Sequence, residues 1–113
     1  MTESSPTLEL VVAAVEPGLV SAGFQHAGTG ESAAYNWVRF RRHERSGDRR
    51  FTRMITVSHA SAEGAFLADA YLYSRDTHTQ TPVAHHLCRY GSPAEAETVA
   101  GELAAVVLGW VRA

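Results

Sequence analysis

Residues 35–59, YNWVRFRRHERSGDRRFTRMITVSH, decide the fold that this sequence predicts. The first eight and the last nine of these residues each alternate between two kinds of side chain with a period of two, which is typical of half-buried β-strands. Between the two runs, Ser46-Gly47-Asp48 is a turn signal. The stretch therefore predicts a β-hairpin.

Further strands are expected after the hairpin. Ser61-Ala-Glu-Gly64 indicates a turn, and residues 65–73 again alternate between an apolar and a mixed face. Residues 74–82 are polar and are expected to form a connection, and residues 83–90 predict a weaker fourth strand. Residues 25–34, which contain Gly28, Thr29, Gly30 and Ser32, are expected to form a loop.

A helix is expected on each side of the strands in sequence. Apolar side chains recur at helical spacing over residues 8–19, with Ser5 as a candidate N-cap and Gly23 as a left-handed C-terminal residue. Pro17-Gly18 predicts a kink or a break in this helix. At the other end, Ser92-Pro-Ala-Glu95 matches a capping box, and an apolar stripe follows it, namely Val99, Leu103, Val106 and Trp110.

These elements predict a single α+β domain over residues 1–113, with residues 1–5 as a flexible terminus. The expected architecture has two layers, in the order helix, three- or four-stranded antiparallel meander, helix. Both helices are expected on one face of the sheet, packed on an apolar set of strand residues, namely Val38, Phe40, Ile55, Val57, Phe66, Ala70 and Leu72.

The second face of the sheet is then left without helices, and it is more aromatic than a plain solvated surface. The strand alternation places His86 there only if the fourth strand is in register, and Tyr90 would accompany it. The candidate binding residues on this face are Trp37, Arg39, Met54, Asp69, Tyr71, Tyr73 and His86.

The residues of this face suggest two functional hypotheses. The leading hypothesis is a small non-enzymatic interaction or accessory module, which forms a homodimer or docks on a protein partner. The alternative is a small-ligand-binding protein or small enzyme with a pocket around Arg39, Asp69, Tyr71 and His86. In that case the histidine would act as a general base and the arginine would hold an anion.

A second alternative is nucleic-acid binding by residues 39–53, which hold seven arginines and two acids. The order helix, strands, helix resembles that of a double-stranded-RNA-binding domain. However, Ser92-Pro-Ala-Glu95 stands where that family has a glycine- and lysine-rich segment. The rest of the chain holds three arginines and ten acids, which disfavours a nucleic-acid partner.

The sequence predicts no catalytic motif, no cofactor and no metal site. His78, His85, His86 and Cys88 do not have zinc-site spacings. Gly28-Thr-Gly30 precedes an expected strand, not the helix that a dinucleotide fingerprint needs.

The single cysteine, the polar N-terminus and the lack of a long apolar run predict a cytoplasmic protein without a membrane partner. All ten basic residues are arginine and none is lysine. We attribute this bias to a GC-rich, bacterial genome.

Overall fold

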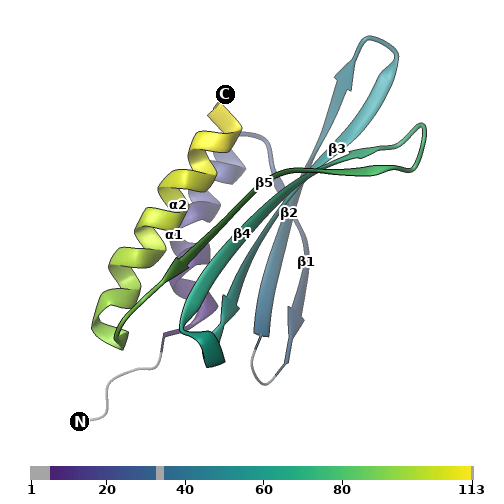
Figure 1. The fold of residues 1–113 in the computed structure, drawn as a ribbon. Coiled ribbons are helices and arrows are strands. Elements are labelled where there is room, and N and C mark those ends of the chain that lie inside the picture. The colour runs from purple at the N-terminus through teal and green to yellow at the C-terminus, as the bar shows by residue number, and fades with distance from the viewer. Residues whose placement is uncertain (1–5, 33–34, 113) are drawn as a thin grey trace.

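The computed structural model describes residues 6–32 and 35–112, which form two helices and a five-stranded antiparallel sheet (Figure 1). The strands follow one another across the sheet in the order β1-β2-β3-β4-β5, and both helices lie on the same face. The α+β fold, with helices that flank the sheet in sequence, is therefore confirmed. The elements are α1 (Leu8–Ser21), β1 (Gln25–Glu31), β2 (Tyr35–Ser46), β3 (Arg49–Ala60), β4 (Ala65–Ser74), β5 (Gln80–Arg89) and α2 (Ala96–Arg112), with short 3-10 turns at Ser61–Glu63 and Pro93–Glu95.

The edge strand β1 is the main difference from the sequence prediction. The glycine-rich composition of residues 25–34 predicts a loop, but residues 25–31 pair with β2 and raise the strand number to five. The glycines have a packing role, because the indole of Trp37 in β2 lies over Gly28 and Gly30. A Cβ atom on Gly30 would lie 2.2 Å from Nε1 of Trp37. The missing side chains therefore make room for a large ring on the neighbouring strand.

The core lies between the helices and one face of the sheet, as the strand alternation predicts. The register pairs Val38 with Val57 and Phe40 with Ile55 on this face. The helices contribute buried apolar side chains at helical spacing, although Val107 and not Val106 is the fully buried residue in the second half of α2. The largest buried side chains are Val11, Val15, Leu19, Phe40, Ile55, Val57, Phe66, Leu103 and Val107.

The end of α1 agrees with the prediction, and of the two outcomes predicted at Pro17-Gly18 the break does not occur. Gly23 has φ +93°, and the N–H of Phe24 donates to the carbonyl of Leu19 at 2.9 Å, so that the ring of Phe24 is buried against the core. The helix runs through Pro17 without a break, and Pro17 lies exposed. Thr7 stands at the N-cap position, while the predicted cap, Ser5, and the terminus 1–5 lie outside the described residues.

The predicted capping box before α2 forms with different partners. Ser92 occupies the cap position without a side-chain hydrogen bond, and its backbone carbonyl accepts from the N–H of Glu95 at 3.0 Å. The Glu95 carboxylate accepts from the N–H of Gly91, not of Ser92. The Glu95 carboxylate therefore binds the backbone one residue before the position that the capping-box motif predicts.

The sheet is longer than the helices that cover it. β2 and β3 have 12 residues each, about 40 Å at the ordinary rise of a strand. The longer helix, α2, has 17 residues, about 25 Å at the helical rise. The β2–β3 turn and the β4–β5 connection consequently extend beyond the helices (Figure 1). We call this part of the sheet the overhang.

The contact between Trp37 and the glycines of β1 can be tested with Gly30→Ala. The added methyl group must displace the indole, so we expect a loss of about 1–3 kcal/mol in unfolding free energy and a shifted Trp37 fluorescence maximum. Measurement in a Trp110→Phe background isolates the Trp37 signal. Gly101→Ala is the matched control, because nothing lies within 4 Å of its Cβ position in α2; it should be neutral or slightly stabilising. Unchanged stability and emission of Gly30→Ala would contradict this packing.

Candidate functional site

Six of the seven candidate binding residues lie on the sheet face that no helix of the described chain covers. The cross-strand register joins Arg39 to Thr56 and Thr56 to Asp69, and it pairs Met54 with Tyr71. Trp37 and Tyr73 share this face by strand alternation. We call this surface the open face. Strand alternation in β2, β3 and β4 therefore assembles the predicted group.

His86 is the exception, and its predicted place is wrong. It pairs with Ala68, which belongs to the core, so His86 lies on the helix side of the sheet. Tyr90 also packs on the helix side, where its hydroxyl lies 2.8 Å from Nε2 of the buried His59. Burial lowers the pKa of His59. The open-face position opposite Asp69 belongs instead to His85.

The register of β5 explains this error. His85 and His86 are adjacent, so a shift of one residue exchanges their faces. The pairing of β4 with β5 is irregular between Ala70 and Tyr71, where Ala70 pairs with Ala84 but Tyr71 pairs with Pro82. The weak alternation of β5 carries no signal for this irregularity.

On the open face, large side chains from the neighbouring strands cover the small hydroxyl residues of β3. The guanidinium of Arg39 lies 4.9 Å from the ring centre of Trp37, and its Nε donates to the hydroxyl of Thr56 at 3.1 Å. The hydroxyl of Tyr35 donates to that of Ser58 at 2.9 Å. Thr56 and Ser58 are 8% and 0% exposed, although no helix covers them. The result is a closely packed surface of half-buried aromatic, aliphatic and charged groups.

Asp69 and His85 form a pair at the other side of β3. Nδ1 of His85 lies 2.5 Å from Oδ1 of Asp69, and the histidine side chain is 59% exposed. A carboxylate that orients an imidazole is one part of a general-base site, but catalysis also needs a substrate held within reach. The pair lies on the outer surface of the sheet, with Asp69 on β4 and His85 on the edge strand β5. By itself this geometry provides a polar contact point.

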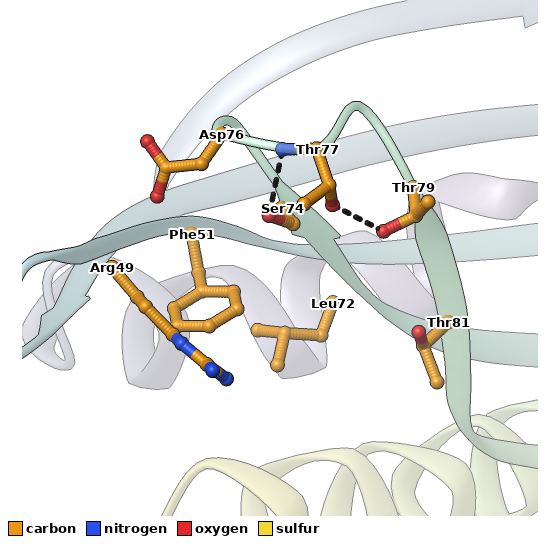
Figure 2. A pocket seen from close by; sticks show the side chains of 8 residues that line it. All are labelled: Arg49, Phe51, Leu72, Ser74, Asp76, Thr77, Thr79 and Thr81. Atoms are coloured by element: carbon orange, nitrogen blue, oxygen red, sulfur yellow. Dashed lines mark hydrogen bonds between the residues drawn. The ribbon is translucent and has the colours of Figure 1, made fainter.

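A hollow of about 320 Å³ lies on the helix side of the overhang, where Arg49, Phe51 and Leu72 point to the side of the helices (Figure 2). The sequence interpretation missed it, because it falls on the connection assigned to residues 74–82. Its polar groups bond to one another. The hydroxyls of Thr77 and Thr79 lie 2.7 Å apart, and the N–H of Thr77 donates to the hydroxyl of Ser74.

The carboxylate of Asp76 points away from this hollow (Figure 2) and binds β3. It accepts from the backbone N–H of Arg50 at 2.8 Å and from its Nε at 3.0 Å. These hydrogen bonds lower the pKa of Asp76. Asp76 thus holds the β4–β5 connection against the hairpin, and the hydroxyls of Ser74, Thr77 and Thr79 take part in hydrogen bonds among these three residues.

The arginine-rich hairpin is more neutral than its sequence suggests. Glu44 accepts from Nε of Arg53 at 2.7 Å and from Nη2 of Arg42 at 2.8 Å. Arg42 also donates to the carbonyl of Ala22 at 2.8 Å, and its guanidinium lies over the ring of Phe24. Although burial raises the pKa of Glu44, the hydrogen bonds from Arg53 and Arg42 outweigh it and hold this pKa below its usual value.

Four of the seven arginines of residues 39–53 are therefore held by groups of the chain itself. They are Arg39 on Trp37 and Thr56, Arg42 and Arg53 on Glu44, and Arg50 on Asp76. The other three, Arg41, Arg45 and Arg49, lie exposed.

Within the described parts of the chain, no three histidine, cysteine, aspartate or glutamate side chains lie together as a metal site would require. Over the same residues, neither helix is long and apolar enough to cross a membrane. No protein-family model, no curated protein and no solved structure matches this chain. The functional proposal for this chain therefore rests on its own structure.

The bridge of Glu44 between two arginines can be tested with Glu44→Gln. Arg42 and Arg53 are directly paired across the strands, so loss of the carboxylate leaves two like charges side by side. Because the folded-state pKa lies below the ordinary value of 4.5, the ionised carboxylate stabilises the fold above about that pH. That stabilisation is lost as the pH falls through the folded-state pKa.

We expect Glu44→Gln to lower the unfolding free energy by about 1 kcal/mol at pH 7 and to approach the wild type near pH 3. Thermal unfolding between pH 3 and pH 8 measures both effects. The exposed Glu63→Gln makes the same charge change without such a bridge, so it should leave the curve almost unaltered. Equal curves for the two variants would contradict the role of Glu44.

Proposed function

We propose that this protein is a non-enzymatic interaction module that binds a second protein chain, in the first place a second copy of itself, through the open face. One observation carries the proposal: a five-stranded sheet presents half-buried aromatic and charged side chains on the face that no described helix covers. The residues that form this surface are Trp37, Arg39, Met54, Leu67, Asp69, Tyr71, Tyr73, His85 and Leu87.

The composition of the open face is that of a protein interface. Tryptophan, tyrosine, methionine and arginine are enriched at the centres of interfaces, and all four occur here within three adjacent strands. Arg39 and Asp69 add one charge of each sign on the two sides of β3. A sheet surface that carries charges of both signs favours another folded surface as its partner, whereas a small ligand needs a concave site.

The ligand-pocket alternative loses one of its four residues, because His86 lies on the helix side. His85 takes its place beside Asp69, but on an exposed surface. Nucleic-acid binding by the hairpin retains three exposed arginines, Arg41, Arg45 and Arg49. Both alternatives predict a monomer whose association state does not depend on Trp37.

Sedimentation velocity over a wide concentration range tests the proposal. We expect a monomer–dimer equilibrium that Trp37→Ala weakens by about 2 kcal/mol, or roughly thirtyfold in the dissociation constant. Since Trp37 also covers Gly30, Tyr71→Ala serves as a second variant on the same face. Both variants should retain the wild-type circular dichroism spectrum.

Val20→Ala is the matched control, because Val20 is an apolar residue 58% exposed on α1 in the other layer. It should dimerise like the wild type. A wild-type chain that stays monomeric at every concentration would rule out self-association through the open face. Equal weakening by Val20→Ala and Tyr71→Ala would show that the effect is not specific to this face.

A further inference from the structure

We infer that two copies pack open face against open face around a two-fold axis parallel to β3, which brings Arg39 onto Asp69 of the partner subunit. This inference rests on the proposed function, because it specifies the arrangement of the dimer that the open face forms. It is carried by the strand register of the sheet and by the positions of the two charges relative to the central strand.

The position of β3 makes the sheet compatible with such an axis. β3 is the third of five strands, so a half-turn about a line along β3 exchanges β2 with β4 and β1 with β5. The same half-turn keeps each cross-strand row of residues opposite its own copy. The resulting interface is isologous, with one patch used twice, as in most homodimers.

The central row of the open face is complementary to itself under this operation. It runs from Arg39 through Thr56 to Asp69. The half-turn leaves Thr56 near the axis and places Arg39 over the partner's Asp69, and the reverse contact forms at the same time. Two ion pairs result from one row of three residues.

The two neighbouring rows are complementary as well. The row of Trp37, Ser58 and Leu67 brings the indole onto Leu67 of the partner subunit. The row of Arg41, Met54 and Tyr71 brings a guanidinium onto the ring of the partner's Tyr71, which is a favourable cation–π arrangement. In each row β2 supplies a side chain whose chemistry suits the one on β4.

Within a single chain these two charges do not reach each other. Thr56 lies between Arg39 and Asp69, so their backbones are two strand spacings apart, about 10 Å. Arg39 donates through Nε to Thr56, and Asp69 binds His85. These contacts use Nε of Arg39 and Oδ1 of Asp69, so the terminal nitrogens of Arg39 and Oδ2 of Asp69 are left for a contact from outside the chain.

Charge also selects this axis over the competing one. A half-turn about an axis perpendicular to the strands through the central row would place Arg39 on Arg39 and Asp69 on Asp69. Like charges in contact across an interface disfavour association. Area permits the favoured arrangement, because five strands and three rows with their flanks span about 24 Å by 20 Å of sheet. This patch of about 480 Å² is smaller than the roughly 800 Å² per partner of ordinary interfaces, so it fits an association at the weak end of the range.

Charge reversal tests the contact directly. Arg39→Asp alone and Asp69→Arg alone each create two like-charged contacts, so we expect each to weaken dimerisation at least tenfold. An equimolar mixture of the two variants restores both ion pairs, and we expect a heterodimer of wild-type affinity. The double variant Arg39→Asp/Asp69→Arg should recover self-association too. Sedimentation velocity with one fluorescently labelled chain distinguishes these species.

Two controls separate the contact from other effects. Glu97→Arg reverses a charge on the exposed side of α2, in the helical layer, and should leave the dimer affinity almost unchanged. Glu16→Arg makes the same charge change as Asp69→Arg on the exposed side of α1, and it should also dimerise normally.

Where a reversal variant fails to fold, the neutral pair Arg39→Gln and Asp69→Asn replaces it. Each neutral substitution should weaken the dimer, and the double variant should be no weaker than either single one.

The outcomes distinguish the two proposals. A monomeric wild type overturns both the proposed function and this arrangement. A wild-type dimer in which the mixed reversal variants do not associate, or in which the neutral substitutions add independently, overturns the arrangement and leaves the proposed function standing. Recovery by the mixture together with normal behaviour of both controls supports the two-fold axis along β3.

Discussion

The second half of the central strand β3 is buried on both faces, and the rest of the structure depends on how this is achieved. On one face Ile55 and Val57 pack beneath the helices. On the other face Thr56 and Ser58 are buried without a helix above them, because Arg39 and Tyr35 reach over from β2 and donate hydrogen bonds to their hydroxyls. A buried hydroxyl without a partner would cost a few kcal/mol. Side chains of β2 on the open face therefore shelter the hydroxyl residues of β3.

The faces of β2, β3 and β4 could be predicted because an alternating pattern fixes side-chain direction without knowledge of the partner strand. The same logic failed for β1 and β5, where the deciding information lies in another strand. Gly28 and Gly30 look like loop residues until Trp37 is placed above them. His85 and His86 differ by one residue, and only the irregular pairing at Ala70 determines which of them meets Asp69.

The neutralisation of the hairpin arginines, in contrast, could have been predicted in part from the sequence. A two-residue turn at Gly47-Asp48 fixes the hairpin register, and this register pairs Arg42 with Arg53. Two arginines paired across strands repel each other unless an acid lies between them. Glu44 lies on the same face as Arg42, two residues along β2, and it supplies that acid. The turn residues and the strand alternation together would have shown that several of the seven arginines are paired with acids, which leaves a smaller cationic patch.

The overhang limits the area over which two open faces can be in contact. In packed sheets the strand twist aligns the centres and separates the corners. The rows of Trp37, Arg39 and Arg41 lie in the part of the sheet that the helices support from behind, whereas Arg45 and the Arg50–Asp76 pair lie in the overhang. An axis parallel to β3 would bring both overhangs to the same end of a dimer, where their like charges repel.

In the proposed arrangement the twist of the sheets would spread the two overhangs apart while the central rows stay in contact. The neutralisation of Arg50 by Asp76 and of two further arginines by Glu44 reduces the remaining repulsion. The same acids that hold the hairpin together in one chain would therefore also reduce the charge that the two overhangs of the proposed dimer bring together.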